Sequence, residues 1–249
     1  MEMGDLYLIA TYVPTKVELD LVGCNHIDPM KHNVKIQPLV QYLETNIKPE
    51  GHKQAKEYIR ESHFYDNDLF NKLSAKEREN DISMLVGAGV ETTIVAMKIM
   101  LVKWADNPER FSDSVHKLGV EQFVVDMLDS DPPLGLATNF CSKDLFLGDE
   151  KISKGNVVHV SILDANKGAV CPMKKAKEFI EKVKNWLTFG LRRHHCPEHL
   201  LAKAELVMLA NLLLSLDINK FHITRSEKDK RPTNFRHPTP YKIEPKKVS

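Results

Sequence analysis

The clearest pattern of apolar and polar positions lies between residues 74 and 108. Ser74 and Glu77 have the spacing of a capping box, in which the serine hydroxyl and the glutamate carboxylate satisfy the first free backbone donors of a helix. Apolar side chains then recur at helical spacing as far as Trp104. Asn107 and Pro108 interrupt the pattern, because the residue before a proline avoids the helical conformation. The sequence therefore predicts one long helix from Ser74 to Trp104.

Shorter elements follow this helix. A second helix is expected over about Val115 to Leu128, and it should end before the turn-forming residues Asp131-Pro132-Pro133. Two strand-like runs come next, at Asp144 to Leu147 and at Asn156 to Ile162, with glycine-containing turns between them. The pattern predicts a small β part after the helices.

A last helix is expected after Cys196. Pro197 suits the first position of a helix, and the leucine-rich sequence from Leu200 to Leu214 predicts that the helix is mostly buried. Residues 1–70 show no pattern from which elements can be assigned. The fold class is therefore mainly α with a small β part.

Composition narrows the class of protein. The chain has 249 residues, 35 basic and 34 acidic side chains, and 42% hydrophobic residues. A net charge of +1 argues against a nucleic-acid binder, and the apolar content argues against a disordered chain. Uninterrupted apolar runs are far shorter than the roughly 20 residues of a membrane span, and Glu2 and Asp5 do not suit a secretory signal. We expect a soluble, cytoplasmic protein.

The cysteines agree with a reducing compartment. Cys24, Cys141, Cys171 and Cys196 are scattered, and no two of them form a Cys-x-x-Cys pair. The charge is less even: from Arg225 onward, eight basic and three acidic residues give +5, which leaves −4 for residues 1–224. This proline-rich end (225–249) is expected to be a solvated terminal hairpin and tail, and contact with an acidic partner is the alternative.

The first break in ordinary helix design is Gly87-Ala88-Gly89 in the middle of the long helix. Each glycine costs about 1 kcal/mol there relative to alanine. Small residues let a flat ligand approach, and Glu91 and Thr92 follow at once as an acid and a hydroxyl that could relay protons. The alternative is a close helix crossing, with Thr92 and Thr93 bonding back to the preceding turn.

The second break is the segment from Phe189 to Cys196, which leads into the last helix. A sulfur beside a helix N-terminus and next to Arg192, Arg193, His194 and His195 should favour its thiolate, and thiolates bind metals. An inert, partly buried cysteine is the alternative. A zinc site of His195, Cys196 and His199 lacks a fourth ligand at conventional spacing.

Together these two segments resemble motifs of one protein family. Ala88-Gly-Val-Glu-Thr-Thr93 resembles the oxygen-activation motif of the cytochrome P-450 haem-thiolate monooxygenases, and Phe189-Gly to Cys196, with Leu201-Ala-Lys-Ala-Glu205, resembles their haem-binding loop and following helix. The order and spacing of these motifs agree with those of the family over about residues 70–224. The resemblance implies one truncated P-450-like domain over 1–249 that corresponds to the C-terminal half of the family.

The resemblance also implies roles for single residues. Cys196 would be the thiolate ligand of haem iron, His194 a propionate partner, and Phe189 and Gly89 further haem contacts. Glu91 and Thr92 would be the catalytic acid–alcohol pair. A thiolate ligand favours O–O cleavage by donating electron density to iron. An external electron donor such as ferredoxin and a small organic substrate are implied in the same way.

The chain also departs from the family. The Glu-x-x-Arg pair falls on Asp126 and Asp129, and the arginine that completes the triad falls on Glu178. Three acids cannot form the usual ion-pair network, so that support of the haem loop should be missing. Arg192 and Glu198 replace two glycines of the loop.

These departures leave two classes of function. Asn139 replaces a propionate-binding arginine, and residues 1–70 do not show the family's N-terminal half. The first class is a haem-binding monooxygenase relative, with a second polypeptide supplying the missing half. The second class is a non-catalytic, haem-free homologue that acts as a partner of a biosynthetic enzyme, or a decayed gene product.

Overall fold

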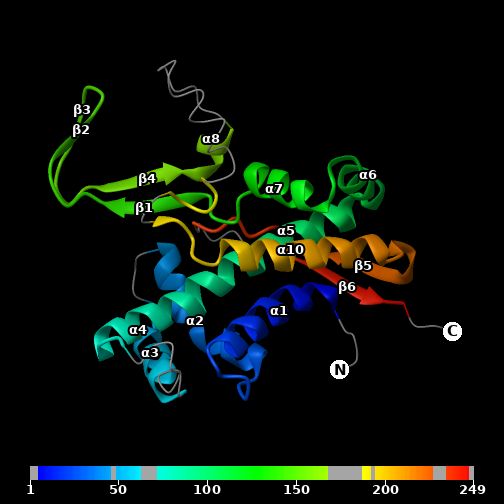
Figure 1. Cartoon of the computed structure of the whole chain (residues 1–249), viewed down its shortest axis with the longest axis horizontal. Coiled ribbons are helices and arrows are strands. Elements are labelled where there is room, and N and C mark those ends of the chain that lie inside the picture. The colour runs from blue at the N-terminus through cyan, green and yellow to red at the C-terminus, as the bar shows by residue number, and fades with distance from the viewer. Residues whose placement is uncertain are drawn as a thin grey trace.

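A computed structural model describes residues 5–45, 49–62, 72–167, 187–191, 194–226 and 234–246. Its central element is the predicted long helix, which consists of α4 (Ala75–Met84), the π-helical turn η3 (Leu85–Gly89) and α5 (Val90–Asp106). The Ser74–Glu77 capping box is present. The helix crosses the whole molecule, and most other elements lie along it (Figure 1).

Three helices occupy the region for which the sequence predicted no element. They are α1 (Leu6–Leu21), α2 (Pro29–Thr45) and α3 (His52–Glu61). Asp5 begins α1 by accepting a hydrogen bond from the Tyr7 backbone N–H at 2.9 Å. The Asp5 carboxylate also accepts the backbone N–H of Ile243 at 2.7 Å, so that the start of the chain is tied to its end.

The predicted second helix is divided into two, which corrects the sequence interpretation. Asn107 caps α6 (Pro108–Leu118), and α7 (Val120–Ser130) follows after Gly119. Gly119 has a φ of 81°, a conformation that favours glycine and that ends α6 before the chain turns into α7. The end of α7 before Pro132 is as predicted.

The β part consists of small antiparallel pairs. Strand β1 (Leu136–Phe140) pairs with β4 (Val157–Ser161), and β2 (Leu145–Leu147) pairs with β3 (Glu150–Ile152). Strands β2 and β4 confirm the two predicted runs, and the short helix α8 (Ile162–Asn166) follows β4. These strands project from one end of the molecule as an arm (Figure 1).

The last helix corrects two expectations. Helix α10 (His199–Ser215) begins at His199 and not at Pro197. Only one side of it is buried: the side chains of Leu200 and Met208 are 70% and 72% exposed. The chain then continues through η5 (Ile218–Lys220) to β5 (Phe221–Arg225), which pairs with β6 (Tyr241–Pro245).

The hydrophobic core surrounds α5. This helix packs against α1, α6 and α10, and its apolar residues from Ile94 to Trp104 are buried, apart from the half-buried Val102. By length and composition the combined helix Ala75–Asp106 could cross a membrane, but 67% of its most apolar 18-residue window is buried within the protein. Burial of that window is typical of the core helix of a soluble protein.

Candidate functional site

The glycine turn is a π-helical turn. It spans Leu85–Gly89, directly before Glu91 and Thr92. The Thr92 hydroxyl donates to the Ala88 carbonyl at 3.0 Å, and the Thr93 hydroxyl donates to the Gly89 carbonyl at 3.3 Å. Both threonines therefore bond back to the preceding turn, which is the alternative that the sequence left open.

The cysteine loop is a tight turn. The Cys196 backbone N–H donates to the Phe189 carbonyl at 2.6 Å and closes the loop. Gly190 has a φ of 73°, and a Cβ on it would lie 2.2 Å from the His194 carbonyl oxygen. Glycine is therefore required at position 190, and this part of the predicted motif has a structural reason.

Neutral hydrogen bonds fix the start of the loop to the end of α7. The Thr188 hydroxyl donates to the Leu128 carbonyl at 3.1 Å. The Asn166 side-chain amide donates to Thr188 Oγ1 at 2.8 Å and to the Asp129 carbonyl at 3.1 Å. These contacts hold the loop where the sequence predicted that the family's ion-pair support is missing.

The acids in the register of the family's triad do not form a buried network in the described part. Asp126 is exposed and accepts a hydrogen bond from Gln122 at 2.7 Å, and Asp129 is partly exposed on α7. Glu178, the third acid, lies outside the described residues, as does Cys171.

The thiol of Cys196 corrects the expectation of a favoured thiolate. Burial raises its pKa, a hydrogen bond from the Glu198 backbone N–H opposes this shift, and the Glu198 carboxylate adds to it. Of the basic side chains on which the expectation rested, Arg192 and Arg193 lie outside the described residues, and His194 is exposed. Among the described groups, burial and the Glu198 carboxylate raise the pKa of Cys196 by more than the hydrogen bond lowers it.

Glu198 brings the cysteine loop into contact with the glycine turn. A Cβ on Gly89 would lie 2.3 Å from Glu198 Oε2 and 2.8 Å from its Cδ. The open face of Gly89, which the sequence assigned to a flat ligand, is therefore covered by a carboxyl group. Burial raises the pKa of Glu198.

Two further acids share this junction. Glu18 on α1 and Glu205 on α10 are buried, at 5% and 7% exposure. Burial and the charge of Glu198 raise the pKa of each to about 7. Sequence reasoning missed this cluster, because the three acids are far apart in the chain and come together only when α1 and α10 pack against the long helix η3–α5.

Phe189, another predicted haem contact, contacts side chains of α10. The Phe189 ring packs on His199 of α10, with 5.9 Å between ring centroids, and the Lys203 ammonium lies 5.4 Å from its centroid. Within the described residues, no group of three His, Cys, Asp or Glu is placed to hold a metal ion, which includes His195, Cys196 and His199.

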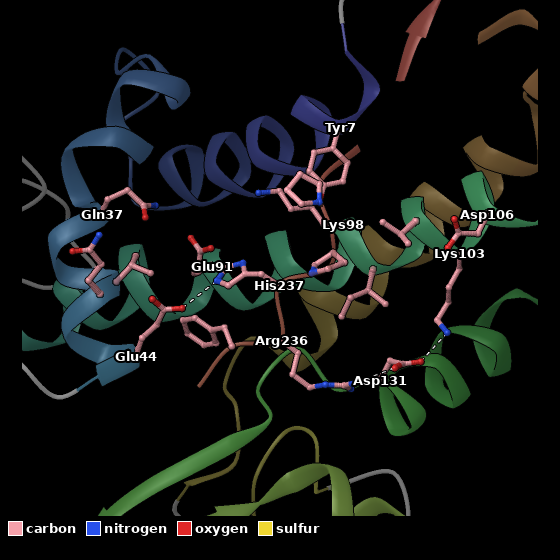
Figure 2. A pocket seen from close by; sticks show the side chains of 17 residues that line it. Tyr7, Gln37, Glu44, Glu91, Lys98, Lys103, Asp106, Asp131, Arg236 and His237 are labelled. Carbon is pink, nitrogen blue, oxygen red and sulfur yellow. Dashed lines mark hydrogen bonds and ion pairs between the residues drawn. The ribbon is translucent and has the colours of Figure 1, made fainter. Parts of the chain in front are cut away.

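Glu91 points to the opposite side of the helix from Gly89. Two residues turn an α-helix by about 200°. Glu91 faces a cavity of about 820 Å³ between α1, α2, α5 and residues 235–240 (Figure 2). Burial raises its pKa, and Lys98 and His237 oppose that shift. Thr92 does not line this cavity, and the catalytic pairing of Glu91 with Thr92 stays a prediction.

Known structures identify the fold. The ligand-free crystal structure of CYP164A2 from Mycobacterium smegmatis matches 96% of this chain and 69% of its own, with a TM-score of 0.71 and 18% identity. The thermophilic cytochrome P450 from Sulfolobus tokodaii matches 95% and 67%, with a TM-score of 0.70 and 19% identity. The chain has the cytochrome P450 fold. It spans about two-thirds of the length of these P450 structures.

A third P450 structure extends this comparison. P450BioI, in complex with an acyl carrier protein ligated to hexadec-9Z-enoic acid, matches 95% of this chain and 67% of its own, with a TM-score of 0.71 and 19% identity. No protein-family model and no curated protein matches the sequence. The likeness therefore establishes the fold, as the sequence motifs predicted.

The P450 fold implies haem, and the described residues do not fit it in this conformation. Haem would lie between the helix that carries Gly89 and the loop that carries Cys196. The Glu198 carboxyl covers Gly89, and the pKa of the ligand thiol is raised. The cavity beside Glu91 contains neither Cys196 nor His194 in its wall. A porphyrin would have to displace the half-buried carboxyl group of Glu198 to reach this helix.

Proposed function

We propose that this chain is a haem-free protein of the P450 fold that acts as a non-catalytic partner of a biosynthetic enzyme in the cytoplasm. The observation that carries the proposal is the contact between Glu198 and Gly89, which fills the face of the glycine turn with a side chain of the protein itself. A protonated thiol and a loop fixed by neutral hydrogen bonds are consistent with a structural role for this region.

The exposed apolar arm supports the proposal that the chain binds a protein partner. Phe140, Phe146 and Leu147 on β1 and β2 are 61%, 69% and 68% exposed. Large apolar side chains gathered on a projecting arm favour protein–protein contact. That P450BioI was solved with a carrier protein gives a precedent for partners of this fold.

The test is co-purification with the enzymes encoded by neighbouring genes, followed by an assay of the captured enzyme with and without this chain. We expect one of them to bind and to gain activity or stability. The double variant Phe146→Ser/Leu147→Ser should lose binding, whereas Val34→Ser, which removes an apolar side chain that is 71% exposed on α2, should retain it. Equal loss in both variants, or no effect of the chain on a bound enzyme, contradicts the proposal.

A haem-dependent monooxygenase is the second candidate function. It is favoured by the hydrogen bond from the Glu198 backbone N–H, which opposes the rise that burial causes in the pKa of Cys196 and would stabilise a thiolate. In this candidate Cys196 would hold haem iron, a second polypeptide would complete the site, and a donor such as ferredoxin would supply electrons for a small organic substrate. Haem uptake by the purified chain separates the two candidates.

A further inference from the structure

The cavity beside Glu91 is separate from the face of Gly89 and from the cysteine loop. Its volume of about 820 Å³ falls within the range of small-molecule sites, and its wall comes from five separate segments. Among the described residues, neither Gly89 nor any of 187–191 and 194–199 belongs to the wall. Figure 2 shows Glu44, Glu91, Lys98 and His237 around the same space. What binds here is therefore independent of haem and of the proposed partner function.

The acids at one end of the cavity have partners. Glu44 accepts from His237 Nε2 at 3.1 Å. Glu91 is buried, and it accepts a side-chain hydrogen bond from Gln37. Both carboxyl groups therefore have donors within the protein.

The acids at the other end are also satisfied. Asp131 forms ion pairs with Lys103 at 2.7 Å and with Arg236 at 3.3 Å. Asp106 accepts the hydroxyl of Tyr241. Asp131 therefore matches the charge of both cations at this end, although Arg236 Nη1 is buried without a hydrogen-bond partner among the described residues.

Lys98 is the exception. Its ammonium lies 5.5 Å from the centroid of the Tyr7 ring, in a cation–π contact. Within the described residues no carboxylate lies within ion-pair distance of it, and its electrostatic partner Glu91 is two helical turns away on α5. Burial lowers the pKa of Lys98, which shows that its charge is poorly solvated. An anion at this position would supply the missing partner.

The rest of the wall suits a hydrocarbon. Val40, Ile99, Val102 and Phe235 contribute apolar surface to the same cavity. We propose that the cavity binds a small organic carboxylic acid, with its carboxylate on the Lys98 ammonium and its hydrocarbon part against these side chains. Recognition rests on one unmatched cation, an aromatic ring beside it and an apolar wall.

The test is calorimetric titration of the full chain with straight-chain carboxylates from butanoate to decanoate, with the alcohols and amines of the same lengths as comparisons. We expect saturable binding of carboxylates with dissociation constants in the micromolar to millimolar range. Lys98→Met should weaken binding at least about tenfold, because the charge-assisted contact is lost. Lys117→Met, at an exposed lysine of α6, should leave the dissociation constant unchanged.

The outcomes are separable. Lys98→Gln serves as a second variant, and circular dichroism checks that each variant is folded. The proposal is overturned if no carboxylate binds saturably, if the alcohols bind as tightly, or if a folded Lys98 variant retains full affinity. Tighter binding of the amines would mean that Glu91 and Glu44 recognise a cation, and it would also overturn the assignment.

Discussion

The carboxyl group of Glu198 occupies the space that a side chain at position 89 would need. A Cβ on Gly89 would come within 2.3 Å of Oε2, and yet Gly89 itself has ordinary helical backbone angles, with φ −64° and ψ −44°. A side chain at position 89 would therefore require the carboxyl end of Glu198 to move, whereas the backbone at this position suits any residue. The glycine turn and the cysteine loop are coupled through this contact.

A double-mutant cycle measures the coupling. In a Glu198→Ala background, Gly89→Ala should stabilise the protein by about 0.5–1 kcal/mol, because alanine is the better helix residue. In the parent, that gain should be largely lost, since the flexible carboxyl end must move away from the new methyl group. Urea unfolding gives the four free energies. Equal effects of Gly89→Ala in the two backgrounds would show that the contact does not exist in solution.

The acid cluster predicts that the protein is more stable in mild acid. Glu18 and Glu205 have folded-state pKa values raised to about 7 from an ordinary value of 4.5, so the folded state holds more protons than the unfolded state between these values. The contribution of these two groups to the free energy of unfolding should therefore be largest below about pH 4.5. It should fall as the pH rises to about 7.

Glutamine substitution isolates this effect. Glu205→Gln should flatten the pH dependence of the unfolding free energy, and at pH above 7 it should raise stability by on the order of 1–3 kcal/mol. Glu150→Gln, at an exposed position of β3, should change neither. A parent protein whose stability rises between mild acid and neutral pH, with Glu205→Gln following the same curve, would contradict the cluster.

The anchor of the cysteine loop predicts a stability effect at a distance from the cysteine. Asn166→Ala removes two hydrogen bonds and leaves Thr188 Oγ1 and the Asp129 carbonyl without this donor, and it should cost about 1–3 kcal/mol. Limited proteolysis should then cut the loop faster. Asn139→Ala, at an exposed amide that contacts only its own strand, is the matched control. Similar small losses in both variants would mean that the loop does not depend on this anchor.

The sequence predicted those elements that local signals determine. The capping box at Ser74, the stop at Pro108 and strands β2 and β4 follow from patterns of a few residues. The division between α6 and α7 was missed, since a single Gly119 inside an apolar pattern does not reveal its φ of 81°. Helices α1 to α3 were missed because their stability depends on packing against one another and against the long helix α4–η3–α5, which short-range periodicity does not report.

The site was predictable only in part for the same reason. The motifs identified Gly89, Cys196 and the fold that carries them. Which side chain lies between them depends on where the start of α10 is held relative to the glycine turn, and nothing local to Glu198 indicates that its carboxyl reaches Gly89. Lys98 was missed because the absence of a carboxylate partner is a property of the assembled cavity.

Titration of the purified chain with haem decides whether Glu198 closes the face of the glycine turn to haem. The absorbance is recorded after chemical reduction with dithionite and addition of carbon monoxide. We expect no saturable uptake of haem and no thiolate-type band in the parent protein. The parent and Cys196→Ser should therefore give the same spectrum. Stoichiometric uptake with a thiolate-type band that Cys196→Ser abolishes would contradict this expectation, and it would restore the monooxygenase as the function of this fold.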